Sequence, residues 1–266
     1  VPARALRTPS SPAGTRAGDD GQGFQLCLPR VAPRQAFRDI ELVPNILRDV
    51  SDVDLTREVF GVTHQMPMGI APTGFTRLMQ TEGEIAGARA AQKFGIPFSL
   101  STLGTTSIED VVKAAPNGDN WFQLYMWKDR EGSMALVERA RRAGVKTLHL
   151  TVDVPAAGHR LRDTYNGLTI PPTLTVKTLL NAIPRPAWWM NFLTTPAIEF
   201  ASMSSWNGTV AELLDYMFDP TMTFEDLKWI RKQWKGNLVV KGIQNVEDAV
   251  MSVKAGADAI ILSNHG

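Results

Sequence analysis

Cysteine is nearly absent from this sequence: Cys27 is the only one among 266 residues. A single thiol excludes an intramolecular disulfide framework and a thiolate cluster for zinc or iron–sulfur, and it suits a reducing compartment. A surplus of one charge is also missing, since 28 basic side chains face 27 acidic ones. No net field gathers nucleic acid, so we expect small-molecule partners and no nucleic acid. We also expect no metal site.

Long apolar runs are lacking as well. No stretch approaches the roughly 20 apolar residues of a membrane-spanning helix, and the first residues have no apolar core of a secretory signal. The sequence therefore predicts a cytoplasmic protein. Residues 1–33 are expected to be a disordered or unrelated N-terminal segment, because Val1–Gly23 is rich in Pro, Ala, Arg, Ser and Gly without apolar periodicity.

Short apolar runs alternate with helical segments from Pro67 onward, which is typical of a parallel sheet with crossover helices. The strand candidates are Met68–Ala71, Phe98–Thr102, Trp121–Tyr125, Thr147–Asp153, Leu238–Lys241 and Ala259–Ser263. Helix starts are indicated by the pairs Ser107 with Asp110, Thr223 with Asp226, and Asn245 with Asp248, and helix ends by Gly95, Gly144, Gly236 and Gly256.

A doubly wound sheet and a (β/α)8 barrel both fit this alternation. No Gly-x-Gly-x-x-Gly motif follows the first strand candidate, so the barrel is favoured over a dinucleotide-binding sheet. A complete barrel has eight strands in about 250 residues, whereas six candidates are present here. We therefore expect an incomplete (β/α)8 TIM barrel over residues 34–266.

A long insertion separates the fourth and fifth strand candidates, at about residues 155–219. It carries several prolines and the apolar cluster Trp188–Met190. We interpret it as a lid packed over the barrel mouth. The alternative is a patch that holds the protein at the inner face of a membrane, for which exposed tryptophan is a suitable anchor.

Side chains two residues apart share one face of a strand, and one face of a barrel strand points inward. Gln123 with Tyr125, Thr151 with Asp153, and Ser263 with His265 therefore form inward pairs at the C-terminal ends of strands, where barrel enzymes place their catalytic groups. The alternate positions Leu124, Leu150 and Val152 are apolar and should pack against the helices.

Lys241 ends the fifth strand candidate, and burying its ammonium requires an anion or an electron-rich ligand. An ion pair with Asp153 is the purely structural explanation. Of the other histidines, we expect His64 and His159 at the surface and His149 to be a core residue with its hydrogen bonds satisfied.

With these residues assembled, the chain resembles the FMN-dependent α-hydroxy-acid dehydrogenase family, of the L-lactate dehydrogenase and glycolate oxidase type. The resemblance runs from about Arg34 to the end of the chain. The matching segments are Met68–Gly74 (MGIAPTG), Gly95–Thr102 (GIPFSLST), Trp121–Tyr125 (WFQLY), Leu150–Pro155 (LTVDVP), Val239–Gly242 (VVKG) and Leu262–Gly266 (LSNHG).

The resemblance implies FMN as cofactor and a role for each matching residue. Lys241 would face the edge of the flavin where negative charge accumulates on reduction. His265 would take a proton from the substrate, Asp153 would stabilise the imidazolium, and Tyr125 and Arg160 would hold the substrate carboxylate. The remaining flavin contacts implied by the family are Pro72, Thr73, Gly74, Ser101, Gln123, Thr151 and Ser263.

The implied reaction is oxidation of a small L-2-hydroxy acid, lactate first, to the 2-oxo acid. The electron acceptor beyond the flavin, whether quinone, cytochrome or oxygen, stays open, as does a homo-oligomeric state. The family's substrate tyrosine has no counterpart in Gly21–Pro33, and its second substrate arginine and the last two strands, which grip the FMN phosphate, would follow Gly266. Two alternatives are therefore kept: a non-catalytic fragment of such an enzyme, and an FMN barrel of another type, such as an isomerase.

Overall fold

The computed structural model describes residues 35–155 and 217–265, together with residues 180, 183–186, 190, 193–195 and 200–202. The chain divides into two compact units. The larger unit, Leu55–Asn264, holds both sheets. The described part of the smaller unit is residues 35–54, a helical turn at 35–38 followed by a mainly irregular chain, and His265.

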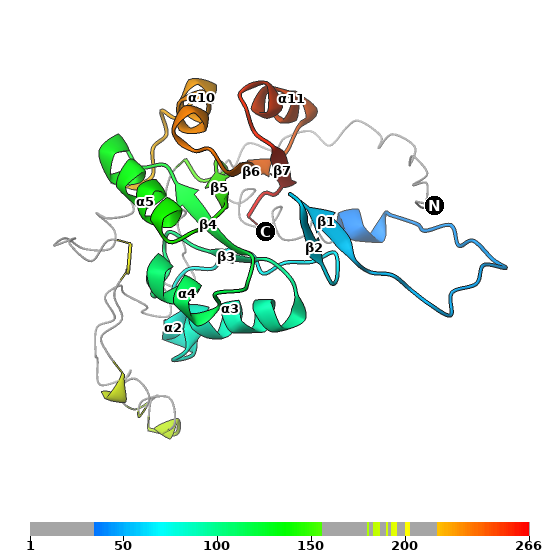
Figure 1. Ribbon diagram of the computed structural model, residues 1–266, viewed down its shortest axis with the longest axis horizontal. Helices are drawn as coiled ribbons and strands as arrows, with labels where there is room; N and C mark the ends of the chain where they lie inside the picture. Colours follow the sequence, from blue (N-terminus) through cyan, green and yellow to red (C-terminus); the bar gives the residue numbers. More distant parts are fainter. Residues whose placement is uncertain are drawn as a thin grey trace, which may run out of the picture. The chain divides into compact units, whose positions relative to one another are not determined.

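Five parallel strands form the main sheet of the larger unit (Figure 1). They are β3 (Phe98–Leu100), β4 (Asn120–Tyr125), β5 (Thr147–Thr151), β6 (Asn237–Ile243) and β7 (Ala259–Leu262). Their order in the sheet is their order in the chain, as in a (β/α)8 barrel, whereas a doubly wound sheet reverses its order at a switch point. Among the described residues the sheet does not close on itself.

The connecting helices are arranged around one side of this sheet (Figure 1). They are α2 (Thr76–Met79), α3 (Gly83–Phe94), α4 (Ile108–Ala114), α5 (Arg130–Arg142), α10 (Phe224–Gln233) and α11 (Val246–Lys254). All three predicted N-terminal caps are confirmed: Ser107, Thr223 and Asn245 each accept a backbone N–H of the first turn. At Thr223 the capping box is complete, because Asp226 accepts the backbone N–H of Thr223 in return.

The predicted helix ends are confirmed at Gly95, Gly144 and Gly256, which adopt the positive φ angles that favour glycine. Gly236 serves another purpose. Its φ is not positive, but a Cβ there would lie 2.2 Å from the carbonyl oxygen of Lys146. Glycine is therefore required by the close approach of two backbones and not by a helix end.

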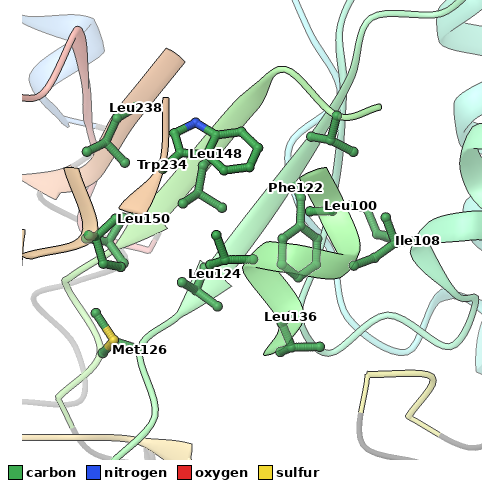
Figure 2. Close-up of a cluster of buried hydrophobic side chains, with 14 of the residues drawn as sticks. Leu100, Ile108, Phe122, Leu124, Met126, Leu136, Leu148, Leu150, Trp234 and Leu238 are labelled. Carbon is green, nitrogen blue, oxygen red and sulfur yellow. The ribbon is translucent and has the colours of Figure 1, made fainter. Parts of the chain in front are cut away.

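The apolar core lies between the sheet and the helices (Figure 2). Alternate strand residues supply one side of it, namely Phe122, Leu124, Leu148, Leu150 and Leu238, each at most 1% exposed. Burial of each such side chain contributes about 1.5–3 kcal/mol. The period-two prediction for Leu124 and Leu150 is confirmed, so the opposite positions of these strands are left for the inner face of the sheet.

The structure differs from the sequence prediction in two places before β3. The strand candidate Met68–Ala71 is reduced to a single parallel bridge between Ile70 and Phe98. An unforeseen antiparallel hairpin, β1 (Arg57–Val59) and β2 (Val62–His64), turns at Phe60–Gly61, both with positive φ.

The hairpin also corrects the prediction for His64, which is 3% exposed and not at the surface. Its Nε2 lies 3.4 Å from Oδ2 of Asp119, a separation longer than a good hydrogen bond but within ion-pair range. His159 lies outside the described residues, as does most of the insertion at 155–219.

Candidate active site

Polar side chains gather at the C-terminal ends of β4, β5 and β6. Tyr125, Thr151 and Lys241 are direct partners in these neighbouring strands and form one row across the sheet. Gln123 pairs with His149 in the row before it. Because partners in register point to the same face, the sheet assembles these side chains from separate parts of the chain.

Gln123 is the best-defined residue of this group. Its side chain is 1% exposed, and its Oε1 accepts hydrogen bonds from Ser101 Oγ, at 3.2 Å, and from the backbone N–H of Thr102, at 3.1 Å. These two donors fix the orientation of the amide. Its Nε2 is buried and has no partner among the described residues. A buried N–H pair without an acceptor is costly, so this donor suits a ligand that offers a carbonyl oxygen.

Lys241 lies in the same row and bonds to residues near the ends of two neighbouring strands. Its Nζ donates to Ser263 Oγ at 2.8 Å and lies 3.8 Å from Oδ2 of Asp153, whose side chain is 2% exposed. The ion pair with Asp153 is thus present, although at 3.8 Å it is too long for a good hydrogen bond. The ammonium is held in place and keeps capacity for a further acceptor.

The backbone beside Lys241 is shaped to admit Asp153. The register between β6 and β7 shifts between Lys241 and Ile243, and Gly242 there has φ 115°. A Cβ on Gly242 would lie 2.6 Å from Cβ of Asp153. The Lys-Gly pair therefore places a cation and a carboxylate side by side, which a larger residue at position 242 would prevent.

Tyr125 and Thr151 border a small cavity. Together with Phe218 and Asp219 they line a cavity of about 60 Å³. The Tyr125 ring meets the Phe218 ring edge to face at 5.2 Å between centroids. Thr151 is 4% exposed, and its hydroxyl has no hydrogen-bond partner among the described residues.

The segment Pro72–Gly74 follows the bridge at Ile70 and runs beside the loop after β3. The backbone N–H of Phe75 donates to the carbonyl oxygen of Leu103 at 3.1 Å. A Cβ on Gly74 would lie 2.9 Å from Cβ of Leu103, so the two loops are in close contact there. This contact brings the backbone of Pro72–Gly74 and the loop that begins at Ser101 into one wall.

A larger cavity of about 230 Å³ lies on the same inner face, lined in part by Pro72, Ser99, His149 and Lys241. His149 was expected to be a core residue with its hydrogen bonds satisfied, and this is right in part. Its Nδ1 lies 3.2 Å from Ser99 Oγ, but its Nε2 has no partner among the described residues. Burial, and then the charge of Lys241, lower the pKa of His149 to about 4, although Asp153 opposes the shift, so the imidazole is neutral.

The geometry does not reach every residue predicted from the sequence. Arg160 lies outside the described residues. His265 has a positive φ and belongs to the smaller unit, so its pairing with Asp153 stays a prediction. Among the described residues, no group of three or more His, Cys, Asp or Glu side chains is placed to hold a metal ion.

Comparison with known proteins decides which family this sheet and its polar row represent. The profile of the FMN-dependent dehydrogenases matches residues 27–266. The chain belongs to this family. Its fold is accordingly an incomplete (β/α)8 barrel, of which the described residues form five consecutive parallel strands.

Similar members of the family are named for two substrates. A Mycobacterium tuberculosis protein, named provisionally as an L-lactate dehydrogenase, is 58% identical over 248 residues, which are 93% of this chain and 59% of that protein. An L-lactate dehydrogenase of Xanthomonas campestris is 42% identical and covers 86% of this chain and 60% of its own length.

Among solved structures, the monotopic membrane protein (S)-mandelate dehydrogenase has a TM-score of 0.82 at 38% identity, over 87% of this chain and 63% of its own. A mandelate oxidase has a TM-score of 0.71 at 36% identity, over 88% and 60%. The chain thus spans about three fifths of the relatives that it matches.

The polar row fits the flavin on which this family depends. An isoalloxazine ring offers carbonyl oxygens and ring nitrogens, and its reduced form carries negative charge at one edge. The described residues supply matching groups: the unpartnered Nε2 of Gln123, the unpartnered hydroxyl of Thr151 and the cation of Lys241. The sequence anticipated these three residues, but it missed His149, which the same period-two count places on the inner face with Thr151.

Proposed function

We propose that this protein oxidises a small L-2-hydroxy acid, L-lactate first, to the 2-oxo acid with FMN bound at the polar row. The proposal is carried by the row of Tyr125, Thr151 and Lys241 and by the adjacent Nε2 of Gln123, which has no partner among the described residues. Bound FMN supplies an acceptor for the two electrons that the substrate loses. The residues of the chain bind the ring, hold the substrate and take up a proton.

Binding of the flavin ring is assigned to the Pro72–Gly74 segment, to the loop that begins at Ser101 and to the strand ends. Gln123 and Thr151 would donate to polar atoms of the ring, and Pro72–Gly74 with Ser101 would supply the wall beside it. Lys241, held by Ser263 and Asp153, would place its charge at the ring edge that becomes negative. Because Lys241 is fixed before the reaction, little reorganisation is needed when that charge develops.

Substrate binding and proton transfer are assigned to four residues. Tyr125 would donate its hydroxyl to the substrate carboxylate, and Arg160 would pair with the same carboxylate. His265 would accept a proton from the substrate as the two electrons leave it, and Asp153 would stabilise the imidazolium that forms. The carboxylate of Asp153 is already buried beside Lys241, with 3.8 Å between Oδ2 and Nζ.

We propose lactate as the substrate because of sequence similarity, whereas structural similarity favours mandelate. The relative with 58% identity bears the name of a lactate enzyme, whereas the structure with a TM-score of 0.82 is a mandelate enzyme at 38% identity. The test is a comparison of kcat/KM for L-lactate and (S)-mandelate with the protein expressed from its complete gene. A preference for L-lactate supports the proposal; a clear preference for mandelate overturns the choice of substrate but not the family reaction.

The insertion at 155–219 is relevant to whether the protein attaches to a membrane. In the described residues no helix is long and apolar enough to cross a membrane. One structural relative is nevertheless a monotopic membrane protein, and the insertion carries Trp188 and Trp189. We propose attachment at a membrane surface through these rings. Co-sedimentation with vesicles of anionic lipid tests this: the variant with both tryptophans changed to serine should remain in the supernatant, and equal binding of both proteins would contradict it.

A further inference from the structure

The first turn of α3 contains a buried carboxylate that the proposed chemistry does not use. Glu84 is the second residue of this helix, and it is 2% exposed. An uncompensated buried carboxylate would be strongly destabilising, so its hydrogen-bond partners are informative. Two of its hydrogen-bond partners lie in the loop between β3 and α4.

Two consecutive threonines of that loop satisfy the carboxylate. Thr105 donates its backbone N–H at 2.8 Å and its hydroxyl at 2.9 Å, and Thr106 donates its hydroxyl at 2.8 Å. Burial raises the pKa of Glu84, but hydrogen bonds that include those from Thr105 and Thr106 outweigh it, and the pKa is lowered from its ordinary value. The ionised form is therefore the one that holds the loop.

The same loop is connected to both walls of the flavin site. Thr105 Oγ1 also accepts the backbone N–H of Arg77 at 3.2 Å, at the start of α2, directly after the Pro72–Gly74 segment. Within the loop, Ser101 accepts the backbone N–H of Gly104 through its carbonyl oxygen and that of Leu103 through its hydroxyl. Ser101 in turn donates to Gln123 Oε1. A continuous set of contacts thus runs from Glu84 to the amide of Gln123.

We propose that Glu84 is a positioning residue of the flavin site: its carboxylate anchors the loop of residues 101–106, and this loop sets the orientation of the Gln123 amide. The inference rests on the proposed function, because Gln123 matters only if a flavin binds there. Glu84 itself touches neither flavin nor substrate in this account. Its effect passes through Thr105, Thr106 and Ser101.

Three variants and one control test the inference in the protein expressed from its complete gene. Glu84→Gln keeps the shape but replaces one acceptor oxygen by a donor that faces Thr106. Thr106→Val removes one hydroxyl, and Thr106→Ser restores it. The control is Glu82→Gln at the start of the same helix. Glu82 is exposed, and its ion pair with Arg89, at 3.7 Å, is between two exposed side chains.

The measurements are the FMN dissociation constant by fluorescence quenching, the visible circular dichroism of bound flavin and the Tm of the apoprotein. We expect Glu84→Gln to weaken FMN binding about tenfold or more and to change the flavin dichroism, since loss of a buried charged hydrogen bond is typically of that size. Thr106→Val should weaken binding several-fold, and Thr106→Ser and Glu82→Gln should bind FMN as the wild type does.

The possible failures are distinguishable. If Glu84→Gln and Thr106→Val lower the Tm but leave FMN affinity and dichroism unchanged below the transition, Glu84 is merely structural and the inference is overturned. If Glu84→Gln does not fold, Thr106→Val against Thr106→Ser decides by the same readouts. A wild-type protein that binds no FMN overturns the proposed function together with this inference.

Discussion

The side chains proposed to bind the flavin ring are held by neighbours that fix their direction. Lys241 is held by Ser263 and Asp153, and Gln123 by Ser101 and Thr102. Such preorganisation matters because a group that is already oriented pays no reorganisation cost when charge develops. The strongest residue-level predictions therefore concern groups whose removal leaves this framework intact.

The proposed base gives the first of these predictions. His265→Gln should leave FMN bound but slow substrate-driven flavin reduction by about 10²–10⁴-fold or more, because a positioned base is lost. The measurement is the anaerobic rate of flavin bleaching in a stopped-flow instrument. His64→Gln is the matched control: it alters the buried contact with Asp119 and should change stability but not this rate. Near-normal reduction by His265→Gln would remove His265 from the mechanism.

The neutral imidazole of His149 predicts how stability depends on pH. Its pKa is lowered from 6.5 to about 4 in the folded protein, so between these values the unfolded chain binds a proton that the folded protein does not. The contribution of the neutral His149 to the free energy of unfolding should therefore be complete above pH 6.5. The free energy of unfolding should fall by about 3 kcal/mol as the pH drops to about 4.

Denaturant titrations at several pH values measure this dependence. His149→Asn removes the titrating group and should flatten the curve over that interval by a similar amount, even if the variant is less stable throughout. Lys241 and Asp153 contribute to the same shift and remain in the variant. Parallel curves for the two proteins would show that His149 is not the group responsible.

The contacts between side chains could not be predicted from the sequence. Counting by twos identified the face of Gln123, Tyr125 and Thr151, because strand alternation is a local property. The same count could not show that His64 meets Asp119 or that Glu84 meets Thr105, since these contacts join segments distant in the chain. The sequence thus predicted a shared face for these three side chains, and only the structure gave the hydrogen bonds of the site.

Helix starts were the most predictable elements, since capping depends on residues only three positions apart. Short strands were less predictable. Met68–Ala71 has the apolar pattern of a strand, yet it makes one bridge to Phe98. The hairpin at Phe60–Gly61 was missed because its strands have three residues each and no clear alternation.

The complete capping box of α10 gives a prediction at the element scale. Thr223→Ala should lower the free energy of unfolding by about 1 kcal/mol, because the first turn loses a backbone hydrogen bond. Lys232→Ala, at an exposed position in the last turn of the same helix, should change it by less than about 0.5 kcal/mol. Urea unfolding followed by circular dichroism measures both. Equal stabilities of the two variants would contradict the role of the cap.

At the scale of the whole molecule, the open edge of the sheet is the main feature. In the described residues β7 pairs only with β6, and exposed apolar side chains of α11 and β7 lie beside it, among them Val246, Val253 and Leu262. Edges and apolar patches of this kind favour association between chains. The chain also spans about three fifths of its relatives.

We therefore expect residues 1–266, expressed by themselves, to bind FMN weakly and to self-associate. The physical reason is that the open sheet admits water to the ring site, and the family's phosphate-binding segment is expected from strands beyond the five described. Fluorescence titration and light scattering measure the two properties. Tight stoichiometric FMN binding by these residues would contradict the expectation, and a second chain that completes the barrel would then be the first explanation to examine.

The central claim, that this family member oxidises an L-2-hydroxy acid at the row of Tyr125, Thr151 and Lys241, has one direct test. The protein expressed from its complete gene is loaded with FMN and mixed anaerobically with L-lactate, with D-lactate as the control. We predict that L-lactate bleaches the visible flavin absorbance and that pyruvate forms in equal amount, whereas D-lactate does neither. A protein that binds FMN but is reduced by neither L-lactate nor (S)-mandelate would contradict the account.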